Sequence, residues 1–322
     1  MKKLQAVATV VSITAAMMSG FAQAQSWQPQ KPIRVIAPAA GGGVDTVLRL
    51  IGGGIEKSLG QPIIVDNRAT STYPQDQLAK ATPDGYQLIY YANQLWLGPF
   101  LRPDIPHDPL KDFSPISLTV QGPNTVLVTA ELPVKTVKEL VDYAKKFPKK
   151  LNFAWAGIGS SPHLAGLLFQ SVTGTEFTEV RYKGQAQAMI DLAAGRTHVS
   201  FPTISTGASI VKGGKARILG VTSEEASPQL PGVPAVAQQG YPDYESVSVH
   251  ALLGPRGMPA NIVNRLNQEV VRFLKLPETG PKVTALGFDV VANSPTQLAA
   301  FMKREMDRMG PILKAAGIKG ED

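Results

Sequence analysis

The chain of 322 residues contains no cysteine, and histidine is scarce. Without thiols, disulfides, thiol redox chemistry and thiolate metal sites are excluded. The four histidines are scattered and lack the H-x-x-x-H spacing of a local zinc motif; they are His107, His163, His198 and His250. We therefore expect neither a metal ion nor any other cofactor.

Beyond residue 24 the chain has no run that is long and apolar enough to span a bilayer. The preceding residues have the pattern of a cleavable signal peptide. Lys2 and Lys3 precede an apolar stretch over residues 6–21, and residues 22–24 form an A-x-A cleavage site. A membrane anchor is the alternative, but the stretch is short and interrupted by hydroxyl side chains. We predict that residues 1–24 are removed and that the exported chain begins at Gln25.

Clusters of basic residues are absent, although the net charge is +7. Removal of Lys2 and Lys3 with the signal peptide would lower it from +7 to +5. No Lys/Arg run could follow a phosphate backbone, so a nucleic-acid partner is not expected. The mild positive charge either favours anionic ligands or serves only solubility.

Strands and helices alternate along the chain, which predicts an α/β protein with parallel sheets covered by helices. The pattern restarts with a helix over residues 137–147. It ends in two amphipathic helices, over residues 260–274 and 295–316. Because these last helices have no strands of their own, we expect them to pack on the first unit.

We predict two lobes, with the second inserted into the first. Lobe 1 comprises residues 25–128 and 247–322, and lobe 2 comprises residues 129–246. The two chain crossings would form a hinge. Ligands of open α/β sheets bind at the carboxyl ends of the strands, so the cleft between the lobes is the expected binding site.

Three glycines, Gly52, Gly53 and Gly54, lie inside the predicted first helix, over residues 44–59. Each costs about 1 kcal/mol relative to alanine in a helix interior. Either the helix is broken at this point, or close packing against another element requires the glycines.

A glycine-rich turn follows the first predicted strand. Glycines let the backbone approach a ligand closely, and the start of the next helix offers free N–H groups and the positive end of its dipole. Such a turn suits a carboxylate or a phosphate. It matches neither G-x-G-x-x-G nor G-K-[ST], which disfavours nucleotides. A plain turn without a ligand is the alternative. The candidate ligand-binding residues are Ala39, Ala40, Gly41, Gly42, Gly43 and Asp45.

A second turn, over residues 157–163, has the same character. Ser160 and Ser161 offer hydroxyl and N–H groups to an anion, or else they cap the helix without a ligand. His163 is a candidate donor, although a histidine in the first turn of a helix is more often structural. An exported serine hydrolase is a remote alternative. The G-x-S-x-G nucleophile elbow is absent, so we predict no catalytic residue and no enzyme.

Other polar residues stand where predicted strands end. Tyr182 is suited to stacking on a planar ligand, and Lys183 to pairing with a carboxylate unless it is simply solvated. Asn93 and Thr203 also follow strands. All four are candidate ligand-binding residues.

Short segments along the whole exported chain have a characteristic order and spacing. They are residues 31–36, 59–68, 83–86, 161–166, 182–184, 230–234 and 254–259. With these segments the chain resembles the substrate-binding proteins of tripartite tricarboxylate transporters, the Bug or TctC-like family. The resemblance implies a two-lobed periplasmic-binding-protein (Venus flytrap) fold, in which each lobe is a sheet flanked by helices. It also implies a periplasmic location and delivery of the ligand to membrane transporter subunits.

The resemblance further implies a carboxylate ligand. In this family the carboxylate is held between the Gly turn of one lobe and the Ser turn of the other, by backbone N–H groups and ordered waters. Carried over to this chain, the contacts are residues 39–43, 160–161 and 182–184. We expect a dicarboxylate or an aromatic carboxylate as the ligand, and a monomeric protein.

Three departures from the family pattern bear on the ligand. Ala39 and Ala40 stand where two prolines are usual. The bulkier, more polar residues 69–75 replace a glycine-rich stretch, which suggests a changed ligand such as an aromatic one and makes Thr72 a candidate contact. Pro202 stands where an aspartate often precedes Thr203, so the ammonium of an amino acid would lose its partner.

Two roles are compatible with this interpretation. The first is capture of a carboxylate for a tripartite tricarboxylate-type transporter. The second is a periplasmic ligand sensor that presents its closed form to a two-component kinase.

Overall fold

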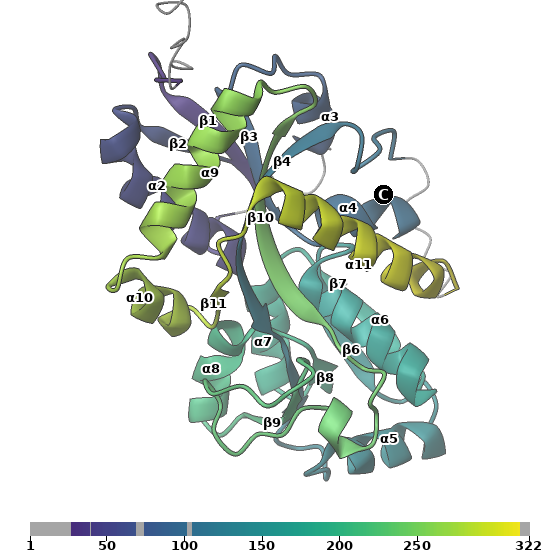
Figure 1. Cartoon of the computed structure of the whole chain (residues 1–322). Coiled ribbons are helices and arrows are strands. Elements are labelled where there is room, and N and C mark those ends of the chain that lie inside the picture. Colours follow the sequence, from purple (N-terminus) through teal and green to yellow (C-terminus); the bar gives the residue numbers. More distant parts are fainter. Residues whose placement is uncertain (1–26, 39, 69–73, 102–104, 316–322) are drawn as a thin grey trace, which may run out of the picture.

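The computed structural model describes residues 27–38, 40–68, 74–101 and 105–315. The predicted signal peptide, Ala39 and Thr72 lie outside these residues. Two β-sheets, each flanked by helices, form the two halves of the molecule (Figure 1). This arrangement confirms the predicted two-lobed fold class.

The first sheet has six strands in the order β11-β4-β10-β3-β1-β2. Strand β1 pairs in parallel with both β2 and β3. Strand β10 runs antiparallel to β3 and β4, and β11 runs antiparallel to β4. The strands are β1 (Ile33–Ala37), β2 (Ile63–Asn67), β3 (Gln87–Ala92), β4 (Phe113–Pro123), β10 (Val247–Pro255) and β11 (Asp289–Val290).

The second sheet has five strands in the order β7-β6-β8-β5-β9. Strand β6 is parallel to β7 and β8, and β5 is antiparallel to β8 and β9. The strands are β5 (Thr125–Thr129), β6 (Asn152–Ala156), β7 (Thr178–Tyr182), β8 (Val199–Ser200) and β9 (Ala216–Val221). A short 3-10 helix, η1 (Ala237–Gln239), follows β9.

Helices cover both sheets (Figure 1). The half with the first sheet contains α2 (Gly43–Leu59), α3 (Pro74–Ala79), α4 (Gln94–Leu101), α9 (Ala260–Leu274), α10 (Thr279–Ala285) and α11 (Pro295–Ala315). The half with the second sheet contains α5 (Val137–Lys146), α6 (Ser161–Thr173), α7 (Gln185–Ala193) and α8 (Ile204–Lys212).

The expectation of parallel sheets is wrong, because both sheets are mixed. Strand β4, which forms much of the antiparallel part, was not predicted. Pro115, Gly122 and Pro123 interrupt its apolar pattern, and such residues normally argue against a central strand. Helix α4 was also missed, because it is apolar on every face and contains Pro99.

The expectation for the C-terminal helices is confirmed. Helix α9 packs against α2 and β4, and α11 packs against β4 and α4. Leu266 of α9 belongs to a buried apolar cluster of the first half, and Met302 of α11 belongs to a second cluster that continues into the other half. The two C-terminal helices therefore pack on the half of the molecule that contains the first sheet.

The chain crosses between the sheets twice, at Asn124 and at Ser246. Thr222 joins the two crossings. Its hydroxyl accepts a hydrogen bond from the Asn124 N–H (2.8 Å) and donates to the Ser246 carbonyl, and its carbonyl accepts from the Ser246 N–H (2.8 Å). Strand pairing puts all of β5 in the second sheet, although the predicted boundary assigned residues up to Val128 to lobe 1. The division into lobes by residue range stays a prediction.

The three glycines lie in an unbroken helix α2. A Cβ atom on Gly54 would lie 2.1 Å from the ring of Phe273 in α9, and one on Gly52 would lie 3.3 Å from Ile63 in β2. Gly53 is exposed and has open space around it. Close packing therefore requires Gly54, constrains Gly52 and places no demand on Gly53.

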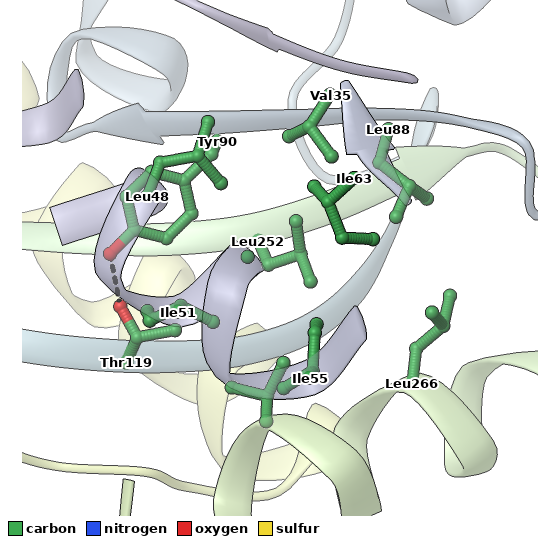
Figure 2. A pocket seen from close by; sticks show the side chains of 12 residues that line it. Val35, Leu48, Ile51, Ile55, Ile63, Leu88, Tyr90, Thr119, Leu252 and Leu266 are labelled. Atoms are coloured by element: carbon green, nitrogen blue, oxygen red, sulfur yellow. Dashed lines mark hydrogen bonds between the residues drawn. The ribbon is translucent and has the colours of Figure 1, made fainter. Parts of the chain in front are cut away.

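A small cavity of about 20 Å³ lies between α2, the first sheet and α9 (Figure 2). Its lining is apolar apart from the Tyr90 and Thr119 hydroxyls, which hydrogen-bond to each other. No polar side chain of this lining is left for a ligand, so the cavity belongs to the core of the first half.

We predict opposite effects of alanine at two neighbouring glycines. Gly53→Ala should raise the free energy of unfolding by about 1 kcal/mol, because the helix gains a better helix former without a clash. Gly54→Ala should lower it by about 1–3 kcal/mol, because Phe273 must move. Urea denaturation of both variants tests this. A change of the same sign in both would contradict the packing argument.

Candidate functional site

A cavity of about 210 Å³ lies between the two sheets and is lined by both halves. Most of its lining comes from the residues that follow β1, β3, β6 and β7, at the carboxyl ends of these strands, as expected for open α/β sheets. The lining residues are Pro38, Gly42, Gly43, Val44, Ala92, Gln94, Ala156, Gly157, Ser160, Ser161, Pro162, Lys183, Gly184, Gln185, Thr203, Thr206, Ser248, His250 and Phe288.

Four helices begin at this cavity. Their N-cap residues are Gly42 for α2, Ser160 for α6, Gly184 for α7 and Thr203 for α8, and each of these lines the cavity. In none of the four does a side chain cap the first turn. Free backbone N–H groups and the positive ends of four helix dipoles therefore converge on one space, which favours an anion.

The side chains that line the cavity reinforce this preference. Among the lining residues that the structure describes, there is no aspartate or glutamate, and Lys183 is the single cation. Lys183 is exposed, so it can reach toward a ligand. The lining attracts negative charge and offers no carboxylate to an ammonium group.

The two sides of the cavity approach each other closely. Gly159 has a positive φ of 71° in the turn before α6. A Cβ atom there would lie 3.2 Å from Leu101 and 3.4 Å from the Cβ of Gln94, both in α4. A larger residue at 159 would push the second half away from the first.

Asp45 stabilises the glycine turn and does not line the cavity. Its carboxylate accepts hydrogen bonds from the Gly41 N–H (3.0 Å), Arg49 Nε (3.1 Å) and Asn67 Nδ2 (2.8 Å). Burial raises the pKa of Asp45, but the bonds from Arg49, Gly41 and Asn67 outweigh it and hold the pKa below its ordinary value. The Asp45 carboxylate is therefore ionised, and the positive charge of Arg49 compensates it. Asn67 also donates to the Pro38 carbonyl (2.7 Å) and so ties down both ends of the turn.

The two serines of the second turn differ in their surroundings. Ser161 Oγ accepts a hydrogen bond from Asn124 Nδ2 (2.7 Å), which leaves its own proton free to be donated. Ser160 Oγ is buried and has no hydrogen-bond partner. Both side chains line the cavity, so both can donate to an anion there.

His163 is fully buried outside the cavity lining. Its ring stacks on Trp155 with centroids 3.9 Å apart, its Nδ1 accepts from the Gly159 N–H (3.0 Å), and its Nε2 lies 3.5 Å from Glu179. The histidine thus positions the second turn. These contacts occupy the ring with groups other than the serines, which removes the basis for a serine hydrolase.

Asn93 also bonds to the protein and does not line the cavity. Its Nδ2 donates to Glu305 in α11 and to the Val247 carbonyl, and its Oδ1 accepts from the Val249 N–H (3.2 Å) in β10. Trp96 Nε1 donates to the other oxygen of Glu305. Asn93 therefore holds α11 and β10 together.

Some of the remaining predicted residues line the cavity, and others lie outside its lining. Gly42, Gly43, Lys183 and Thr203 line the cavity. Tyr182 lies outside the lining, and its hydroxyl donates to Asp191 (2.8 Å). Burial and Asp191 raise the pKa of Tyr182 to about 12. Ala40 and Gly41 are exposed and outside the lining.

Six lining residues with polar or aromatic side chains were not predicted. Gln94, Gln185 and Thr206 lie in the first turns of helices, so position after a strand could have indicated them. Ser248 and His250 lie inside β10, and Phe288 follows α10, where no turn motif marks them. The six are Gln94, Gln185, Thr206, Ser248, His250 and Phe288.

In the described part of the chain, no three His, Asp or Glu side chains gather in a way that could hold a metal ion. Among the residues that the structure describes, none of the helices has the length and apolar character needed to cross a membrane.

A two-lobed α/β chain with its cavity between the lobes has the architecture of a periplasmic solute-binding protein. Residues 47–318 match the model of the TctC family, the tripartite tricarboxylate transporter family receptor. The chain belongs to this family.

Solved structures agree with this assignment. Rpa4515 of R. palustris with adipate is 32% identical, with a TM-score of 0.84 over 90% of this chain and 99% of that one. MatC from Rhodopseudomonas palustris with bound malate is 30% identical, with a TM-score of 0.81 over 88% and 99%. The periplasmic binding protein BugD is 29% identical, with a TM-score of 0.80 over 90% and 99%.

The family resemblance seen in the sequence is thereby confirmed. The protein is a periplasmic solute-binding protein of the TctC family, and its family consists of transporter receptors that are not enzymes.

We predict that Glu305 makes stability depend on pH. Burial raises the pKa of Glu305 from 4.5 to about 7. Hydrogen bonds from Trp96 and Asn93 and the charge of Arg308 lower the pKa in part, whereas the charge of Glu245 raises it further. In the native state Glu305 keeps a proton that the unfolded chain has lost, so stability should fall as pH rises from about 4.5 to about 7. The contribution lost is on the order of 3 kcal/mol.

Urea denaturation between about pH 5 and pH 8 measures this. Glu305→Gln should flatten the pH dependence, whereas Asp307→Asn, at an exposed acid of the same helix, should leave it unchanged. Identical pH profiles for the wild type and Glu305→Gln would rule out this role of Glu305.

Proposed function

We propose that the cavity binds a small carboxylate. The observation that carries this proposal is the convergence of four uncapped helix N-termini on a lining whose described residues include no acid. Charge-assisted hydrogen bonds from backbone N–H groups to a carboxylate are stronger than neutral ones. The candidate contacts are Gly42, Gly43, Ser160, Ser161, Lys183 and Thr203.

The distribution of the helices favours an acid group at each end of the ligand. Helix α2 begins on the side of the first sheet, and α6, α7 and α8 begin on the side of the second. Relatives with known ligands bind adipate and malate, which both carry two carboxylates. A dicarboxylate is therefore the leading ligand class.

An aromatic carboxylate is the second candidate. Apolar groups line part of the same cavity, among them Phe288, Pro38 and Ala92. A ring packed on these groups with its carboxylate at the helix N-termini would use both kinds of lining.

Capture proceeds in this proposal by closure of the predicted lobes about the two crossings. Helix N-termini from both sides would then contact the same ligand, and its charge would hold the closed form. The closed protein would deliver the ligand to the membrane subunits of a tripartite tricarboxylate-type transporter. The family's description as a transporter receptor supports delivery over a sensor role.

Thermal unfolding with a panel of ligands tests the carboxylate proposal. Adipate, malate, benzoate and their amides should be compared on the full exported chain. A carboxylate at about 100 times its dissociation constant should add about 2.7 kcal/mol of stability, and its amide should add none. Stabilisation by amides or amines alone would contradict the proposal.

Lys183→Met supplies a matched variant. It should weaken carboxylate binding about tenfold, because one charged donor is lost. Lys212→Met, at an exposed lysine in the last turn of α8, should bind as the wild type does. Equal affinities in calorimetry for the two variants would remove Lys183 from the site.

A further inference from the structure

The cavity has a floor whose chemistry differs from that of its rim. The floor comes from Ser248 and His250 in β10 and from Phe288 before β11. All three are buried, at no more than 2% exposure. No helix begins among them, so the floor offers a hydroxyl, an imidazole and a phenyl ring in place of backbone N–H groups.

His250 sits in an aromatic surrounding. Its ring centroid lies 4.5 Å from that of Phe288 and 5.9 Å from that of Tyr90. Gly43 faces the pair: a Cβ atom there would lie 3.4 Å from Phe288 and 3.9 Å from the Cε1 of His250. The first residue of α2 thus keeps the space next to His250 open only because it is glycine.

The imidazole carries an unsatisfied polar atom. His250 Nδ1 is buried and has no hydrogen-bond partner. Burial lowers the pKa of His250 to about 3, so the ring is neutral near pH 7 and presents one N–H donor and one acceptor nitrogen. Buried polar groups are almost always paired, so an imidazole that lines a cavity without a hydrogen-bond partner is suited to bond to the occupant.

We propose that His250 recognises a neutral oxygen, a hydroxyl or an oxo group, on the carbon skeleton of the carboxylate ligand. The ligand is then a hydroxy or oxo carboxylic acid. This inference rests on the proposed function, because the helix N-termini must hold the carboxylate for its skeleton to reach the floor.

Other occupants fit the floor less well. A second carboxylate against a neutral imidazole and two aromatic rings would lose its hydration without gaining charge compensation. An ammonium group would find no acid among the lining residues that the structure describes. A purely aliphatic chain would leave the imidazole without a hydrogen-bond partner. A neutral oxygen satisfies the histidine and bears no charge.

The test compares acids that differ only by one hydroxyl. Isothermal titration of the full exported chain should use malate against succinate and mandelate against phenylacetate. In at least one pair, the hydroxy acid should bind about tenfold tighter, because its deoxy analogue leaves the histidine unpaired. Equal affinities within both pairs would overturn the proposal.

His250→Phe assigns the discrimination to the imidazole. This variant keeps an aromatic ring but removes both nitrogens, so the hydroxy acid should bind no tighter than its deoxy analogue, while the affinity for the analogue stays within about twofold. Tyr90→Phe is the matched control, because it removes a hydroxyl from the same aromatic group that already bonds to Thr119. It should keep the discrimination. Discrimination that survives in a folded His250→Phe would overturn the proposal.

The outcomes separate this inference from the function on which it rests. If no carboxylate binds to the wild type, both fail. If hydroxy and deoxy acids bind equally well, the carboxylate site stands and the role of His250 is wrong. If circular dichroism shows that His250→Phe is unfolded, His250→Gln takes its place. The glutamine amide offers a donor and an acceptor, so His250→Gln should prefer the hydroxy acid over the deoxy acid more strongly than His250→Leu does. An equal preference in these two variants would contradict the proposed role of His250.

Discussion

The positive ends of four helices meet in one cavity, and the surrounding structure is arranged around that concentration of charge. Helix dipoles of one sign at one place repel each other unless an anion lies between them. The described residues of the lining accordingly include no carboxylate. The nearby Asp45 is outside the lining, and Arg49 compensates its charge. Because the helices come from both sheets, an anionic ligand of the proposed kind would also draw the two halves together.

The mixed sheets add a second kind of surface to the same site. Parallel strands end at the cavity and lead into helices, which provides the charged rim. Strand β10 runs antiparallel to its neighbours in the first sheet, so its N-terminal part, and not its carboxyl end, reaches the cavity. The backbone N–H groups of a paired strand already bond to neighbouring strands, so such a strand offers a ligand its side chains and no free N–H groups. In the proposed function the rim would therefore select ligands by charge, and the floor would select among acids of the same charge.

Much of this architecture could be predicted from the sequence, where local chemistry and final position coincide. Turns with Gly42, Ser160 and Thr203 begin helices, and the helices that follow β1, β6 and β8 begin at the cavity. The prediction failed where tertiary contacts decide. Asn93 and Tyr182 leave their strands at the expected place but bond to Glu305 and Asp191. His250 has no local motif, because its place in the cavity follows from the pairing of β10 with strands far away in sequence.

Thr222 has a mechanical consequence. It bonds the two crossing segments to each other, at Asn124 and at Ser246, so they cannot slide independently. In the proposed closure, these joined segments would bend together, as one hinge. Ligand binding would then change the shape of the molecule in one way, which a membrane partner could detect without contacting the ligand.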